Sequence, residues 1–468
     1  RKPARESHEL KSKFRQLDGH EQAFVTNWPM TLKRLLLGSH ASSVVWSVLE
    51  LGCSTGAQLI LTPLLLNRLG VDQFSIWVIA LTVLVGSATL SLGTGTALLP
   101  VLAHANAKGD ATGAWAAISI FFRRSVMTSA VLFVVMSAAA SLGWAPAILS
   151  ALEPWDLWVL ASAILTWAFI TEIDNGLSSA LKARSRFDIS ALIEAVTRAA
   201  QLGLTFWLLG SGGLALIPII LAIAVTGIKA WTKLLVLRAQ WPRVTCQINA
   251  TEDRTTSVTA ELGASGSWIW LGLLSGLMFN AFDRWFLAAQ LGAAALTAYA
   301  TCAQIAQMPH ALVAAAGQTL APWAARRRDQ LAAGDVRHGI RRVLLLATAA
   351  AALPSLMLLL VLQPLLGWWI SKDFAVANLP TAQGLTIAFC LLALNVPAYF
   401  LLFGLGRVRT STILSAFSGI VFVGGCLIIP PAVPGFVFMK GLFAAMTLGL
   451  AVCVLVLTRA GLTAPMRN

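Results

Sequence analysis

LGLLSGLMFNAFDRWFLAAQLGAAALTAYA, residues 271–300, is the segment that decides the fold. It forms an apolar helix carrying Asp283 and Arg284, breaks at Leu291-Gly292 and continues as a second apolar helix through Tyr299. An acidic and a basic side chain inside an apolar span are costly to place in lipid. We therefore expect this pair to have a partner, a cavity or a function.

The composition is that of a membrane protein. Of the 468 residues, 57% are hydrophobic and only 12% are charged, and the mean hydropathy is +0.76. A soluble domain needs more charge on its surface. The net charge of +14 does not indicate nucleic-acid binding, because the basic residues fall in short connections between apolar segments. The six cysteines show no metal-binding spacing, and no phosphate loop is present, so we expect neither an enzyme nor a metal or cofactor site.

Windows of about twenty apolar residues, enough to cross a bilayer, occur about twelve times. The sequence therefore predicts an all-α polytopic membrane protein with about 12 transmembrane helices. The predicted spans are 42–66, 73–99, 118–142, 155–181, 188–209, 213–237, 265–289, 293–323, 342–367, 379–403, 410–431 and 436–458.

The basic residues orient these spans. Of the 34 lysines and arginines, 28 lie in the first forty residues or in alternate connections. Lys and Arg accumulate on the cytosolic side, so the pattern predicts an even number of spans with both termini cytosolic. The remaining six are Arg68, Lys372 and Lys440 on the opposite side, and Arg198, Lys229 and Arg284 within spans.

The spans divide into two halves of six. We predict a disordered basic cytosolic tail, an N-terminal bundle, a cytosolic linker, a C-terminal bundle and a second cytosolic tail. Their expected ranges are 1–40, 41–238, 239–262, 263–460 and 461–468.

The two halves share an internal repeat. Leu69-Gly70 matches Leu291-Gly292 at a separation of 222 residues. The motif Gly-x-x-x-Gly on the first and seventh spans predicts a stripe of small residues that packs against another helix. The other matched pairs are Trp77 with Tyr299, Gly95 with Gly317, Leu98 with Leu320, Pro100 with Pro322, Gly52 with Gly272, and Gly56 with Gly276. Parallel six-helix halves with a site between them are typical of alternating access.

The run Asp283-Arg284, Leu291-Gly292, Tyr299 and Leu320-x-Pro322, followed by a basic loop, resembles the Wzx-type oligosaccharide flippases. Their superfamily, MOP, also contains the MATE drug exporters and the lipid II flippase. The resemblance implies a flippase in the bacterial inner membrane that moves undecaprenyl-diphosphate-linked oligosaccharide units from the cytosolic to the periplasmic leaflet. It also implies a cationic cavity and, as partners, the polysaccharide polymerase and chain-length machinery.

Intramembrane bases are the candidates for binding the diphosphate, because Arg and Lys form charge-assisted hydrogen bonds with phosphate. They are Arg284, Arg198 and Lys229. For each of these bases, a structural role is an alternative to diphosphate binding. Arg284 could pair with an acid on another helix, Arg198 has Glu194 one turn earlier, and Lys229 could extend with Lys233 to the inner interface.

Buried carboxylates are the candidates for coupling transport to H⁺ or Na⁺. Glu50 ranks first because it is the most isolated, although it could instead form a fixed pair with Arg198 or Lys229. Two of the acids lie near the inner interface, where solvation would explain them equally well: Glu172 and Asp174. The other candidates are Asp283 and Glu194.

Three alternatives compete with the flippase. A MATE-type multidrug or cation antiporter has the same architecture, but would favour an acidic cavity. A membrane polysaccharide polymerase or ligase would need a large outer loop, and the outer connections are short. A major-facilitator sugar transporter would need a basic, Gly-rich second loop between His104 and Arg124, which is missing.

Overall fold

The predicted all-α membrane fold is confirmed. The computed structural model describes residues 41–90, 111–141, 153–184, 186–209, 214–240, 274–317, 334–405 and 407–460, with the single residues 98, 102, 268, 271, 272, 320 and 324. Every element in this part of the chain is a helix, the state in which a backbone inside lipid satisfies its own hydrogen bonds. Seven described segments have the length and apolar composition to cross a membrane.

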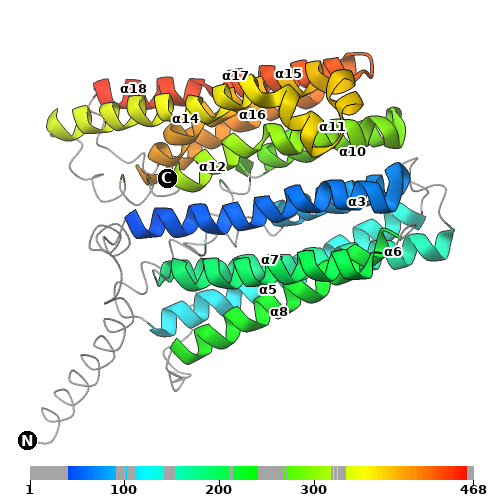
Figure 1. The fold of residues 1–468 in the computed structure, drawn as a ribbon. Coiled ribbons are helices and arrows are strands. Elements are labelled where there is room, and N and C mark those ends of the chain that lie inside the picture. The colour runs from blue at the N-terminus through cyan, green and yellow to red at the C-terminus, as the bar shows by residue number, and fades with distance from the viewer. Residues whose placement is uncertain are drawn as a thin grey trace, which may run out of the picture.

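The helices form two groups, which lie one above the other in Figure 1. The first group is α3 (Ala41–Leu90), α5 (Ala111–Ser141), α6 (Pro154–Ala183), α7 (Phe187–Leu208) and α8 (Leu216–Gln240). The second is η2 (Met278–Phe282), α10 (Asp283–Gln290), α11 (Gly292–Ala306), α12 (Met308–Gly317), α14 (Gly334–Trp369), α15 (Lys372–Gly404), α16 (Val408–Ile428), α17 (Val433–Thr447) and α18 (Gly449–Ala460). We call these groups the N-bundle and the C-bundle. The predicted tails, 1–40 and 461–468, and most of the predicted linker lie outside the described residues.

The repeated Leu-Gly pair makes the same backbone turn in both bundles. Gly70 has φ 75° and ψ 174°, and it divides α3 into two legs that correspond to the first two predicted spans. Gly292 has φ 79° and begins α11. These are the two glycines with positive φ in the described ranges. Glycine adopts this conformation without the steric cost that a Cβ would add.

The bundles share a core near these turns and have separate cores elsewhere. One apolar cluster joins Leu65 and Trp77 of the N-bundle to Ala288 and Leu296 of the C-bundle. A cluster around Phe121 contains only N-bundle helices and the single residues 98 and 102. Another, around Leu401, contains only residues of the C-terminal half. The two bundles therefore share a core at the end that carries Gly70 and Gly292, and α3 also contacts α12 farther from these turns.

Polar contacts between the bundles lie toward the same end. The Thr62 hydroxyl is 2.6 Å from the Gln304 side-chain oxygen. The Trp369 indole N–H donates to the Leu59 carbonyl at 2.9 Å. By the predicted orientation, this end faces away from the cytosol.

No helix among the described residues packs against the small-residue stripe of the first span. A Cβ added to Gly52 or Gly56 would meet no described atom within 4 Å, and the same holds for Gly276. Only Gly272 has a neighbour, the Thr412 hydroxyl at 3.5 Å. Gly52 and Gly56 line a cavity instead.

Replacing Gly70 by alanine should lower the free energy of unfolding by about 1–3 kcal/mol, because its φ and ψ belong to a region that only glycine adopts readily. Denaturant unfolding of the purified protein in detergent micelles measures this change. The matched control is Gly203→Ala in α7, where a Cβ also meets nothing within 4 Å and φ is not positive. It should be neutral or stabilising. Equal effects at the two positions would contradict the conformational argument.

Candidate functional site

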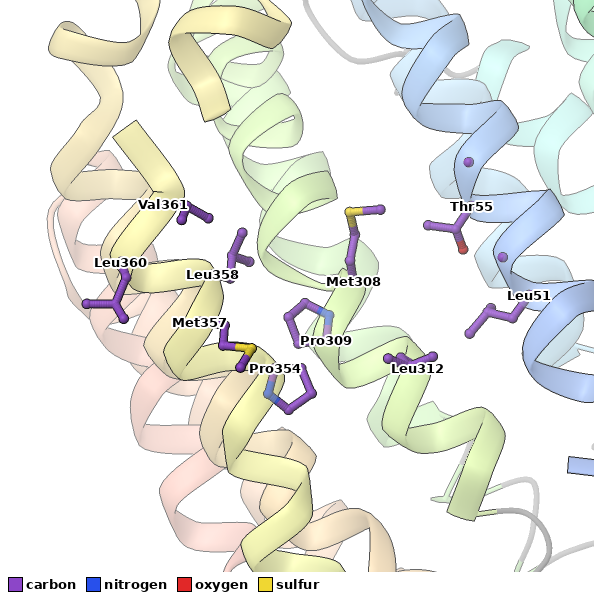
Figure 2. A pocket seen from close by; sticks show the side chains of 12 residues that line it. Leu51, Thr55, Met308, Pro309, Leu312, Pro354, Met357, Leu358, Leu360 and Val361 are labelled. Atoms are coloured by element: carbon purple, nitrogen blue, oxygen red, sulfur yellow. The ribbon is translucent and has the colours of Figure 1, made fainter. Parts of the chain in front are cut away.

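A cavity of about 650 Å³ lies between the bundles. It lies next to the layer of contacts between the bundles that Leu59 and Thr62 make, since Thr55 on its wall precedes Leu59 by about one turn of α3 and Thr62 by about two. Its volume is in the usual range for a small-molecule site. Figure 2 shows α3 on one side and α12 and α14 on the other. Its lining residues are Leu51, Gly52, Thr55, Gly56, Met308, Pro309, Leu312, Pro354, Met357, Leu358, Leu360 and Val361.

The cavity wall is apolar and continues onto the outer surface of α14. Thr55 supplies the one polar side chain among the lining residues. Leu360 is 84% exposed, and Met357 and Val361 are exposed as well. In a membrane, this surface of α14 meets lipid. The cavity therefore suits an apolar chain that enters from the bilayer.

Five charged side chains, four of them buried, form a network inside the N-bundle. Glu194 accepts from Arg198 at 2.8 Å and from Lys229 at 2.9 Å. The Lys229 ammonium also lies 2.8 Å from Asp174, whose other oxygen lies 2.8 Å from Lys233. The network connects α6, α7 and α8 inside an apolar bundle, where an unpaired charge would be expensive.

This network confirms one predicted contact and corrects three others. Arg198 pairs with Glu194 one turn earlier, as its spacing indicated. Lys229 does not extend to the inner interface, because two carboxylates on neighbouring helices hold it. Lys233 is 1% exposed in its ion pair, so it does not belong to the cytosolic connection. Asp174 is buried, so contact with water does not account for a charged side chain at this position.

The surroundings of Glu172 and Glu50 also differ from those expected from the sequence. Glu172 is buried rather than solvated. Glu50 is not isolated, and its partner is neither Arg198 nor Lys229. Its carboxylate lies 3.0 Å from the Lys182 ammonium and accepts from the Ser190 hydroxyl at 3.1 Å. Glu50 thus connects α3 to the end of α6 and the start of α7.

The C-bundle contains a second buried ion pair. The Asp283 carboxylate lies 2.9 Å from the Lys440 ammonium, and both side chains are 0% exposed. Asp283 also accepts a hydrogen bond from the Tyr299 hydroxyl. Lys440, which the distribution of basic residues places on the outer side, is buried inside the C-bundle. A lone lysine within the predicted span 436–458 was the signal that could have identified it.

Arg284 is arranged differently from its neighbour. Its backbone N–H donates to Asp283 at 2.9 Å. Its side-chain Nε has no hydrogen-bond partner among the residues that the structure describes. The π-helical turn Met278–Phe282 immediately precedes the Asp283-Arg284 pair, and such turns occur frequently at functional sites. Arg284 is thus the predicted base whose guanidinium is least engaged.

The predicted site residues do not form one cationic cavity. Arg198 and Lys229 share the N-bundle network, whereas Arg284 lies on α10 of the C-bundle. None of the three lines the cavity between the bundles. No group of three or more His, Cys, Asp or Glu side chains in the described ranges is arranged to hold a metal ion.

Asp174→Asn should lower the free energy of unfolding by about 3–5 kcal/mol, because it leaves Lys233 buried without its carboxylate partner. Urea or guanidinium unfolding in micelles measures the loss. The control is Asp188→Asn, which removes a half-exposed pair with Arg186 at 3.2 Å. It should cost at most about 1 kcal/mol. An Asp174→Asn loss as small as that of the control would show that the network is not a structural tie.

Comparison with known proteins gives the fold. No protein-family model and no curated protein matches the sequence. An outward-facing multidrug resistance MATE family transporter of the MOP superfamily is 14% identical, with 91% of this chain and 97% of that chain covered and a TM-score of 0.67. An inward-facing structure of such a transporter is 13% identical, with 88% of this chain and 94% of that chain covered and a TM-score of 0.62. The Vibrio cholerae MATE transporter VcmN is 17% identical, with 90% of this chain and 98% of that chain covered and a TM-score of 0.64. The chain is a multi-pass membrane protein with the fold of the MATE family transporters.

Proposed function

We propose that the protein is an alternating-access flippase that moves undecaprenyl-diphosphate-linked oligosaccharide units from the cytosolic to the periplasmic leaflet. The observation that carries this proposal is the apolar cavity between the bundles, open along α14. A lipid-linked cargo keeps its chain in contact with the membrane while its polar head crosses. A wall that continues onto the lipid-facing surface fits such a cargo.

A MATE-type antiporter of amphipathic cations is the second candidate. Structures with a similar fold are described as multidrug resistance MATE family transporters, and an apolar wall also suits the apolar part of such a cation. The residues that line the cavity include neither an acid that would pair with a cation nor a base that would pair with a diphosphate, so their charge does not separate the two cargoes. The exposed apolar surface of α14 that continues the cavity wall favours the lipid-linked cargo, because a long lipid chain can stay in contact with it.

We assign the head-group role first to Arg284. Its side chain can accept a new anionic partner without breaking an ion pair, because its Nε makes no hydrogen bond among the described residues. Arg198 and Lys229 would have to exchange Glu194 for the diphosphate. Glu50 remains our first candidate for coupling to H⁺ or Na⁺, since its pair with Lys182 is more exposed than the pair of Asp283 with Lys440.

Purified protein in vesicles should move a fluorescently labelled undecaprenyl-diphosphate glycan between leaflets, measured by the accessibility of the label to a membrane-impermeant quencher. Ethidium, an aromatic cation, serves as the cargo of the rival function. Movement of the glycan without movement of ethidium supports the flippase. Ethidium movement alone, by protein with an intact fold, would replace it with the antiporter.

Arg284→Ala should slow glycan movement about tenfold or more, the effect of losing one charged hydrogen bond. The melting temperature should not change, because the Arg284 Nε has no hydrogen bond to lose among the described residues. Arg284→Lys should restore part of the rate, since it keeps the charge without the bidentate geometry. Full activity of Arg284→Ala would remove Arg284 from the head-group site.

Cross-linking the bundles at their contact layer should stop transport, because alternating access requires this end to open. In a background without the native cysteines, Thr62→Cys with Gln304→Cys joins α3 to α11. The rate should fall on oxidation and recover on reduction. The control pair, Gln73→Cys with Ala215→Cys, joins two segments of the N-bundle that are in contact at 3.0 Å. Transport that continues in the oxidised Thr62–Gln304 pair would exclude movement at this layer.

A further inference from the structure

The Asp283 carboxylate is in contact with three polar groups of its own bundle. One oxygen accepts from the backbone N–H of Arg284 at 2.9 Å. The other accepts from the Tyr299 hydroxyl and lies 2.9 Å from the Lys440 ammonium. These groups come from α10, α11 and α17. The carboxylate is therefore held in a fixed position at 0% exposure.

Aromatic rings surround the other side of the Lys440 ammonium. Its nitrogen lies 4.5 Å from the ring centroid of Phe279, 5.2 Å from Phe389 and 5.7 Å from Tyr299. The faces of aromatic rings carry partial negative charge and attract cations within about 6 Å. One carboxylate and three ring faces form the kind of environment that recognises a free ammonium ion.

We propose that Asp283, Tyr299, Phe279 and Phe389 form a binding site for a small primary ammonium ion, and that Lys440 fills this site as a tethered cation. The side chain arrives from α17, while the site is built by η2, α10, α11 and α15. The site thus has walls that do not depend on the covalent attachment of its occupant.

The tether has a consequence for ion coupling. Because the Lys440 side chain keeps its ammonium beside Asp283, a free cation must displace this ammonium to reach the carboxylate. Asp283 is thereby removed from the candidates for H⁺ or Na⁺ coupling, and any such coupling falls to the acids of the N-bundle. This inference concerns the C-bundle alone and does not depend on the cargo.

Lys440→Ala tests the site directly. The substitution deletes Cγ, Cδ, Cε and Nζ, which together correspond to one propylammonium ion. We expect the full-length variant in detergent to melt at a lower temperature than the wild type. Added propylammonium should then raise its melting temperature saturably by about 2 °C or more, as for a ligand that binds only the folded state. The wild type should not respond.

Three controls separate a site from a general solvent effect. The neutral analogue 1-propanol has a similar shape without the charge and should not stabilise Lys440→Ala. Tetramethylammonium has no N–H to donate to the carboxylate and should act weakly. The double variant Asp283→Asn with Lys440→Ala lacks the counter-charge and should not respond to propylammonium.

The proposal is overturned if propylammonium stabilises Lys440→Ala no more than 1-propanol does, or if it stabilises the double variant equally. If Lys440→Ala does not accumulate in the membrane, the measurement becomes its yield when expressed and purified in propylammonium. Recovery of folded protein with propylammonium and not with 1-propanol supports the site. Equal yields in the two additives count against it.

Discussion

The pairing of charges inside an apolar protein is the constraint on which this structure depends. Charged side chains in the interior of a membrane protein are stable only when their charges and hydrogen bonds are satisfied. Asp174 on α6 and Glu194 on α7 hold the bases of α7 and α8 in one bundle. Asp283 and Lys440 join α10 to α17 in the other. Each set lies within a single bundle, so each bundle is tied internally while the contacts between the bundles remain fewer and weaker.

This arrangement divides the molecule into parts that can move and parts that cannot. The inter-bundle contacts are an apolar cluster and a small number of hydrogen bonds, such as that between Trp369 and Leu59. Breaking them exposes none of the buried ion pairs that the structure describes. Opening this end of the molecule therefore costs much less than deforming either bundle. A structure built in this way favours rocking of two rigid bodies around the cavity between α3, α12 and α14.

The sequence predicted the features that depend on local spacing. The Leu-Gly pairs at Gly70 and Gly292 were matched by their separation, and both have the positive φ of a tight turn. The ion pair between Glu194 and Arg198 was predicted from their spacing of about one helical turn. The partners of Asp283 and Glu50 did not follow, because Lys440 and Lys182 lie on helices that are distant in the sequence. Periodicity says which face of a helix a residue occupies, but not which helix covers that face.

The π-helical turn before Asp283 has a consequence for how the chain tolerates length changes. A π-turn accommodates one more residue than the α-helical turn it replaces. Deleting one residue between Met278 and Phe282 would convert this segment to a regular α-helical turn and leave the two flanking parts of the helix in nearly their present orientation. Ser275, whose hydroxyl donates to the Ser415 carbonyl on α16, would then keep that contact while Asp283 stays beside Lys440. A single deletion is thus better tolerated here than in the regular helix on either side, where it would rotate one flank by about 100° relative to the other.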